Sequence, residues 1–183
     1  MWMRLMAVAG CALATMSGCE SVKRASEEPT HEERIAAQIA AKKSPMGTMD
    51  RLIGVWEQAD EQGQMHTVVS YRATANGTAV CETLFEGTPH EMITMYHMDG
   101  DSLMMTHYCA AGNQPRLRQV KTADPNVLRF EYAGATNYSK GDVVMGRLVM
   151  TFADDDHLTQ AWTSFDDGKE AEGVTFTLTR KTQ

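Results

Sequence analysis

Residues 146–181 have the sequence GRLVMTFADDDHLTQAWTSFDDGKEAEGVTFTLTRK, and this stretch decides the fold class. Apolar and polar residues alternate in it, and two acidic clusters, Asp154-Asp155-Asp156 and Asp166-Asp167-Gly168, interrupt the alternation. Such alternation is typical of half-buried strands, while Asp and Gly favour turns. The stretch therefore predicts three consecutive antiparallel strands joined by short connections.

The same pattern extends upstream to Leu52, with further turn signals at Asn76-Gly77, Asp99-Gly100 and Asp124-Pro125-Asn126. A long antiparallel meander usually closes on itself, because closure removes the exposed edges. We therefore expect an all-β fold, an antiparallel up-and-down β-barrel of about ten strands with a short N-terminal helix outside it. A β-sandwich is the alternative. The expected strands are 52–58, 64–74, 78–86, 91–98, 102–109, 115–122, 127–133, 146–153, 157–165 and 172–181.

Two features of this barrel resemble the calycins, the superfamily of lipocalins and fatty-acid-binding proteins. Gly54-Val55-Trp56 matches their G-x-W signature, whose tryptophan closes one end of the barrel beneath a basic residue from the last strand. Alternation in the last strand places Arg180 on the inward face, where it is expected to stack on Trp56. Residues 91–116 also resemble an uncharacterised group of calycin-like bacterial proteins. The resemblance covers most of residues 50–181 and implies a fold without an established activity.

The N-terminus has the features of an exported lipoprotein. Arg4 precedes an apolar run of 11 residues, LMAVAGCALAT, which is too short to span a bilayer but suits a signal peptide. Met16-Ser17-Gly18-Cys19 follows as a lipobox, although Met16 departs from the usual Leu. We expect residues 1–18 to be removed and Cys19 to carry the lipid, palmitate included. An ordinary signal peptide cut near Gly18 is the alternative.

Sorting and charge follow from the same boundary. Glu20 replaces the Asp that retains many lipoproteins in the inner membrane, which favours the outer membrane, facing the periplasm. Removal of residues 1–18 leaves 165 residues with 16 basic and 24 acidic side chains. This acidity argues against nucleic acid as a partner, because that affinity comes largely from Lys and Arg. The expected partners are the membrane, through the anchor, and a small apolar or amphipathic ligand.

Residues 19–46 are expected to form a tether between the anchor and a barrel domain at 47–183. Within the tether, Thr30-His31-Glu32-Glu33 is a capping box that opens a helix ending at Lys43. Ile35 and Ile39 give this helix one narrow apolar stripe. A solvated spacer helix is the preferred interpretation, and a helix that covers one end of the domain is the alternative.

The strands at 91–98 and 102–109 contain the most promising side chains. A turn at Asp99-Gly100 predicts that Tyr96 lies opposite Leu103 and Thr94 opposite Met105. The face that carries few ionisable groups is expected inside, and a bulge at the turn would reverse this assignment. That face consists of Met92, Thr94, Tyr96, Leu103, Met105, His107 and Cys109.

His107 and Cys109 would then lie near one mouth of the barrel, followed by a polar loop. Such a pair could ligate a soft metal or act as base and nucleophile, but no third partner has a recognisable spacing. A hydrogen-bonded histidine and a buried thiol are the structural alternative. Asn113, Gln114 and Arg116 could hold the polar head of an amphipathic ligand or simply cap turns. The ligand-binding candidates are Tyr96, His107, Cys109, Asn113, Gln114 and Arg116, and the sequence identifies no catalytic residue, metal ligand or cofactor.

Two further expectations concern buried chemistry. Cys81 and Cys109 fall on the third and fifth strands, about 9.5 Å apart at two strand spacings, whereas a disulfide needs Cα atoms within about 7 Å. They are therefore not expected to pair. Glu82 and Glu91 are expected on the solvated outer face.

Three functions remain open. The leading hypothesis is a membrane-anchored lipoprotein that binds a small or lipid-like molecule in its barrel. The second is an enzyme that uses His107 with Cys109, or with Glu91 if the register is reversed. The third is a structural envelope protein with a packed barrel.

Overall fold

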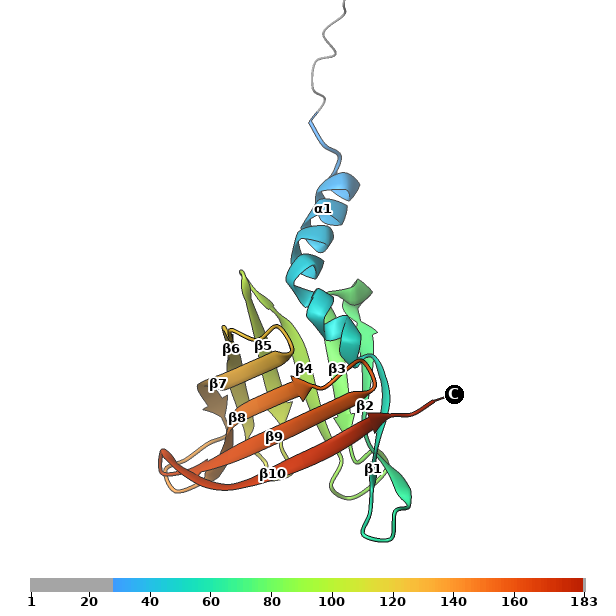
Figure 1. Cartoon of the computed structure of the whole chain (residues 1–183). Helices are drawn as coiled ribbons and strands as arrows, with labels where there is room; N and C mark the ends of the chain where they lie inside the picture. Colours follow the sequence, from blue (N-terminus) through green and yellow to red (C-terminus); the bar gives the residue numbers. More distant parts are fainter. Residues whose placement is uncertain (1–27, 183) are drawn as a thin grey trace, which may run out of the picture.

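The computed structural model describes residues 28–182 of the chain. Ten strands form a closed antiparallel barrel in which neighbours in sequence pair and β10 returns to β1 (Figure 1). The predicted all-β, up-and-down barrel is confirmed, and the sandwich alternative is wrong. The strands are β1 (Gly54–Ala59), β2 (Met65–Thr74), β3 (Ala79–Leu84), β4 (Met92–Asp99), β5 (Ser102–Tyr108), β6 (Gln114–Val120), β7 (Val127–Thr136), β8 (Val143–Phe152), β9 (His157–Asp166) and β10 (Lys169–Arg180).

Two strands begin three residues earlier than predicted, for local reasons. β8 begins at Val143, because Gly146 lies at an irregularity in the pairing with β9 and does not end the strand. β10 begins at Lys169, because Asp167 and Gly168 both adopt positive φ, at 49° and 78°. Two such residues form the tight hairpin turn that matches the twist of the flanking strands. The hairpin between β9 and β10 is therefore longer than expected.

The short helix α1 (His31–Lys43) stands at one end of the barrel (Figure 1). Its predicted capping box is present: the Glu33 N–H donates to the Thr30 hydroxyl at 3.2 Å, and the Thr30 N–H donates to the Glu33 carboxylate at 2.7 Å. Ile35 is exposed and Ile39 is half-buried. Among the described residues, no helix is long and apolar enough to cross a bilayer. The expected signal peptide at 1–18 and the expected lipid attachment site, Cys19, lie outside these residues.

A second helix, the 3₁₀ helix η1 (Ser44–Leu52), closes the end of the barrel next to α1. The sequence did not predict it. Its apolar residues Met46, Met49 and Leu52 are buried in the barrel core, and Trp56 on β1 is fully buried beside them. The Trp56 indole N–H donates to the Leu52 carbonyl at 2.8 Å. Part of the segment expected to be a tether is thus a plug of the barrel.

Arg180, at the end of β10, fastens this plug. Its guanidinium lies 4.3 Å from the centre of the Trp56 ring. It also donates to the carbonyl oxygens of Arg51 at 2.6 Å, Ile53 at 2.7 Å and Asp155 at 2.7 Å. One side chain therefore ties the end of η1, the entry to β1 and the loop between β8 and β9 together.

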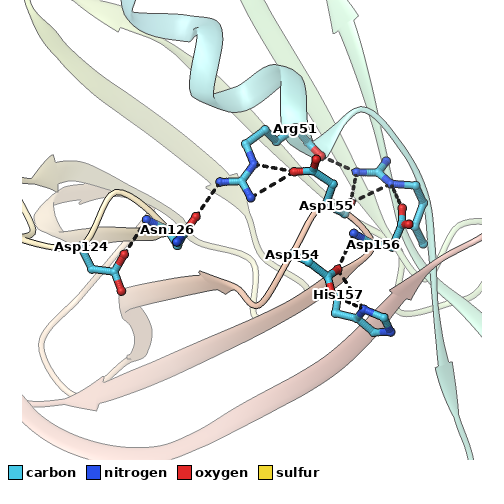
Figure 2. A network of polar contacts seen from close by, with 8 residues as sticks. Arg51, Asp124, Asn126, Asp154, Asp155, Asp156 and His157 are labelled. Atoms are coloured by element: carbon cyan, nitrogen blue, oxygen red, sulfur yellow. Dashed lines mark hydrogen bonds and ion pairs between the residues drawn. The ribbon is translucent and has the colours of Figure 1, made fainter.

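Arg51 adds a second set of contacts at the same end (Figure 2). Its side chain donates to Asp155 at 3.2 Å and to the Asn126 amide oxygen at 3.1 Å, and its guanidinium lies 4.2 Å from the centre of the Phe152 ring. In the loop between β8 and β9, which contains Asp155, Asp154 accepts a hydrogen bond from the Asp156 N–H and contacts the His157 ring. The acidic cluster at 154–156 is therefore engaged in closing the barrel.

The interior next to this plug is filled. The side chains that meet there come from four strands, β5 to β8, and are almost completely buried. They are Leu103, Met105, Leu117, Phe130, Leu148 and Met150. Within residues 28–182, the interior cavity lies toward the other end of the barrel.

Candidate functional site

The strands β4 and β5 place their inward side chains as expected but pair them differently. Tyr96 lies opposite Met105 and Thr94 lies opposite His107, because the turn is centred on Gly100-Asp101. The pairing differs from the predicted one by two residues, and a shift by an even number leaves every side chain on its own face. The inward face was thus predicted correctly, whereas the individual pairs were wrong.

Four polar side chains lie side by side on the inner wall of the barrel, at the level of His107. Each of the strands β2 to β5 contributes one of them, and each lies opposite the next across a strand pair. In strand order they are Tyr71, Glu82, Thr94 and His107. All four are buried, and the Thr94 hydroxyl is 2.9 Å from His107 Nδ1. We call these four residues the polar row. The expectation that Glu82 lies on the solvated outer face was wrong.

Glu82 is fully buried and hydrogen-bonded on both oxygens. The Tyr96 hydroxyl donates to Oε2, and the Gln160 amide donates to Oε1 at 3.1 Å and to the Tyr71 hydroxyl at 3.2 Å. Burial raises the pKa of Glu82 to about 7, although the hydrogen bonds from Tyr96 and Gln160 oppose this rise. Burial, with the neighbouring carboxyl, also raises the pKa values of Tyr71 and Tyr96.

A cavity of about 180 Å³ lies on the side of the polar row that faces away from the plug. His107 and Trp162 are neighbours in its wall, with ring centres 4.8 Å apart, and burial lowers the pKa of His107 to about 4. The imidazole is therefore neutral at pH 7. Phe85 and Phe176 meet edge to face at 5.8 Å. The cavity is lined by Leu84, Phe85, Met92, His107, Met145, Trp162, Val174 and Phe176.

Two enclosed polar atoms near the cavity have no hydrogen-bond partner within residues 28–182. They are the indole N–H of Trp162 and the amide oxygen of Gln160, on neighbouring inward positions of β9. Both atoms are shielded from the cavity, whose exposed lining is almost entirely apolar. Of the two residues, Trp162 lines the cavity directly.

The structure separates the six candidate ligand-binding residues. His107 lines the cavity, and Tyr96 lies deeper, bonded to Glu82. Asn113 is buried and donates to the Val143 carbonyl at 2.9 Å, which fastens the loop before β6.

The other three candidates, like Tyr96 and Asn113, lie outside the cavity lining. Cys109 is half-buried, and its N–H donates to the Asn113 carbonyl at 3.1 Å. Gln114 binds Gly112 and Thr136, and Arg116 is exposed on β6. The alternation of β6, with Pro115 and Leu117 buried, turns both of these side chains outward.

The alternative pairings of His107 are not assembled in this structure. Glu91 is exposed, and its carboxylate accepts the N–H of Gly87 at 2.7 Å. Cys81 and Cys109 are both free thiols. Across the described part of the chain, no group of three or more His, Cys, Asp or Glu side chains is placed to hold a metal ion.

Sequence reasoning missed Glu82, Gln160 and Trp162. One signal for the last two was available, because Leu158, Gln160 and Trp162 share the inward face of a regularly alternating strand. No family model and no curated protein matches the chain. The chemistry of the site therefore follows from its geometry, which is a small cavity with an almost entirely apolar lining, bounded by the polar row on the side of the plug.

Proposed function

We propose that the protein is a membrane-anchored lipoprotein of the calycin type that holds a small, mainly apolar molecule in this cavity. The observation that carries the proposal is the cavity itself, open space beside a barrel that is otherwise packed. An engineered protein cavity of about 150 Å³ binds benzene, so a space of about 180 Å³ suits a molecule of aromatic-ring size. A long acyl chain would not fit, because the other half of the interior is filled.

The calycin relationship is supported by the closed end of the barrel. A ten-strand antiparallel barrel has Trp56 at its base, with Arg180 from the last strand across the indole. This is the arrangement that the G-x-W signature implies. In that arrangement the plugged end is structural, and the ligand enters from the opposite end, where the cavity lies.

Mutation of the proposed anchor gives a direct test of localisation. Cys19→Ser is expected to abolish incorporation of labelled palmitate and to release the protein from the membrane fraction, because the thiol is the acceptor of the lipid. Cys11→Ser is the matched control and should leave labelling unchanged, because Val8-Ala9-Gly10-Cys11 has the same local pattern but almost no apolar run before it. Labelling that persists in Cys19→Ser, or disappears in Cys11→Ser, would contradict the assignment.

A substitution at the cavity rim tests ligand binding. Val174 lines the cavity and is 41% exposed, so Val174→Phe can be accommodated in the strand while its ring occupies part of the cavity. We expect the Kd for ethylbenzene, measured by calorimetry, to rise about tenfold, since overpacking costs about 1–3 kcal/mol. Val143→Phe is the matched control, because Val143 is 50% exposed but does not line the cavity.

The two variants give distinct outcomes. The proposal requires saturable binding to the wild-type protein and a selective loss in Val174→Phe. Equal effects of both substitutions would move the binding site elsewhere. No saturable binding of ethylbenzene to the wild type would overturn the proposal in favour of a packed structural barrel.

A further inference from the structure

The last strand closes the barrel over only a short part of its length. β10 pairs with β9 from Lys169 to Thr179, but it pairs with β1 only at Thr179 and Arg180. The two strands meet at the plugged end and diverge from there (Figure 1). Residues 169–175 are all exposed. Within residues 28–182, most of one edge of β10 therefore pairs with no other strand.

The hydrogen bonds of β10 show which backbone groups lie on this edge. The Thr177 N–H points to the β1 side, where it donates to the side-chain oxygen of Gln58 at 2.9 Å. The Lys181 N–H points to the same side and donates to a β1 carbonyl at 2.9 Å. Alternate residues of a strand direct their backbone groups to the same edge, so those of Gly173 and Thr175 also lie there.

This segment, Gly173–Thr177, is called the free edge below, and its sequence favours strand pairing. It reads GVTFT, with no charge and no proline, whereas exposed edges are usually protected by lysine, other charges or proline. Val, Thr and Phe all favour strands. An extended polypeptide can add to such an edge, where main-chain hydrogen bonds give affinity and alternate side chains give specificity.

The end of the barrel around the free edge is acidic. The connections at this end, residues 60–64, 85–91, 109–113, 137–142 and 166–172, carry nine acidic side chains and two lysines. Asp166, Asp167 and Glu172 are the exposed acids of β10 and of the turn before it, besides Glu170, which is paired with Arg147. A second copy of the chain would bring the same acidic end against itself, whereas a basic partner complements it.

The inward side of the free edge borders the cavity. Val174 and Phe176 both line it, and Val174 is 41% exposed. Residues opposite each other on paired strands direct their side chains to the same face. In a strand added to the free edge, the residue opposite Val174 or Phe176 would therefore turn its side chain toward the cavity. An apolar side chain suits that position, because the cavity lining is almost entirely apolar.

We propose that the free edge binds an extended segment of a basic polypeptide, which adds as a strand beside Gly173–Thr177 and places an apolar side chain against Val174 and Phe176. The backbone groups of Gly173 and Thr175 supply the hydrogen bonds. The acidic side chains around the edge attract the basic ones of the segment. The inference goes beyond the proposed function and does not depend on a small molecule in the cavity.

The test uses the full chain and a synthetic peptide, KVKLKVK with blocked termini, whose binding is measured by calorimetry. We expect saturable binding, and a Kd about tenfold higher or more for the acidic control peptide EVELEVE. Thr175→Pro removes an N–H that does not pair with β9, a position where a strand tolerates proline, and it should raise the Kd for KVKLKVK about tenfold. Thr175→Val is the matched control, because it keeps the N–H and should leave the Kd unchanged.

A second measurement needs no variant to fold. Hydrogen exchange at the Thr175 amide of the wild-type protein is expected to slow about tenfold or more when KVKLKVK is saturating, because the added strand accepts this N–H. The Phe176 amide is the internal control. It points toward β9, so its exchange should be slow with and without the peptide.

Each result decides a separate point. Peptide binding that leaves the Thr175 amide unprotected would show charge attraction alone and overturn the strand addition. Equally tight binding of EVELEVE would overturn the preference for a basic partner. Self-association of the wild type that Thr175→Pro abolishes would assign the edge to a second copy instead. If KVKLKVK does not bind, the inference fails, while the cavity function, which is tested with ethylbenzene, is unaffected.

Discussion

Between pH 4.5 and pH 7, the free energy of unfolding of the wild-type protein is expected to fall by about 3 kcal/mol relative to that of Glu82→Gln. Burial raises the pKa of Glu82 from 4.5 to about 7. The folded protein therefore retains a proton on this carboxyl that the unfolded chain loses near pH 4.5. The stabilising contribution of the neutral carboxyl is complete below that pH and is lost as the pH rises through 7. Glutamine has nearly the same shape and does not titrate.

The surroundings of Glu82 explain why the effect is large. The groups that face it are the hydroxyls of Tyr71 and Tyr96, the amide of Gln160 and the polar row neighbour Thr94. None of them is a cation, and the pKa values of both tyrosines are raised, so they stay neutral. The ionised carboxylate is thus stabilised by hydrogen bonds alone in a buried site.

His107 acts in the opposite direction and would mask the effect in the wild-type protein alone. Burial lowers its pKa from 6.5 to about 4, so the unfolded chain takes up a proton below pH 6.5 while the folded protein does not. Stability linked to His107 is therefore lost as the pH falls toward 4, whereas stability linked to Glu82 is lost as the pH rises. The two contributions oppose each other between pH 4.5 and 6.5.

Urea unfolding of both proteins at several pH values separates these contributions. In Glu82→Gln this carboxyl no longer titrates. The free energy of unfolding of the variant should therefore rise with pH, because of His107. Glu86→Gln is a suitable control, because Glu86 is exposed in the loop between β3 and β4, and its curve should run parallel to the wild-type curve. Parallel curves for Glu82→Gln and the wild type would show that Glu82 is not a buried, neutral carboxyl.

The strands of the barrel were predictable because their signals are local. Alternation and turn residues such as Asp167-Gly168 act within a few residues of chain, so the strands were expected close to where they lie. The plug η1 was missed, because Met46, Met49 and Leu52 show a spacing of three over a single short segment. The segment differs from a tether only because the end of the barrel buries these three side chains, and that contact cannot be seen in the sequence.

The site was harder to predict, because it depends on which strands face each other across the barrel. His107 was placed on the correct face from its own strand. Trp162 comes from β9, and its contact with His107 follows only from closure of the barrel. Glu82 was placed outside because charged side chains are seldom buried. The apolar residues Val80 and Leu84, two positions before and after it, indicated correctly that this face of β3 points inward.

Trp56→Ala is expected to destabilise the protein by about 3–5 kcal/mol, the usual cost of removing a large buried aromatic side chain. Trp56 is fully buried between η1 and the barrel core, with the Arg180 guanidinium across its ring. Its loss leaves a void, frees the Leu52 carbonyl and removes the surface on which Arg180 rests. Trp56→Phe keeps part of the ring and should cost less. Urea unfolding of the three proteins at one pH measures the difference.

The same variant shows whether the two ends of the barrel are independent. The plug lies at one end and the cavity at the other, with the packed side chains of Met105, Phe130 and Leu148 between them. At a temperature where Trp56→Ala remains folded, its Kd for ethylbenzene should therefore stay within about twofold of the wild-type value, a difference of about 0.4 kcal/mol. A loss of stability below about 1 kcal/mol would contradict the role of Trp56 in the plug. A large rise in Kd would show instead that the plug shapes the cavity through the core, and that the closed end belongs to the binding site.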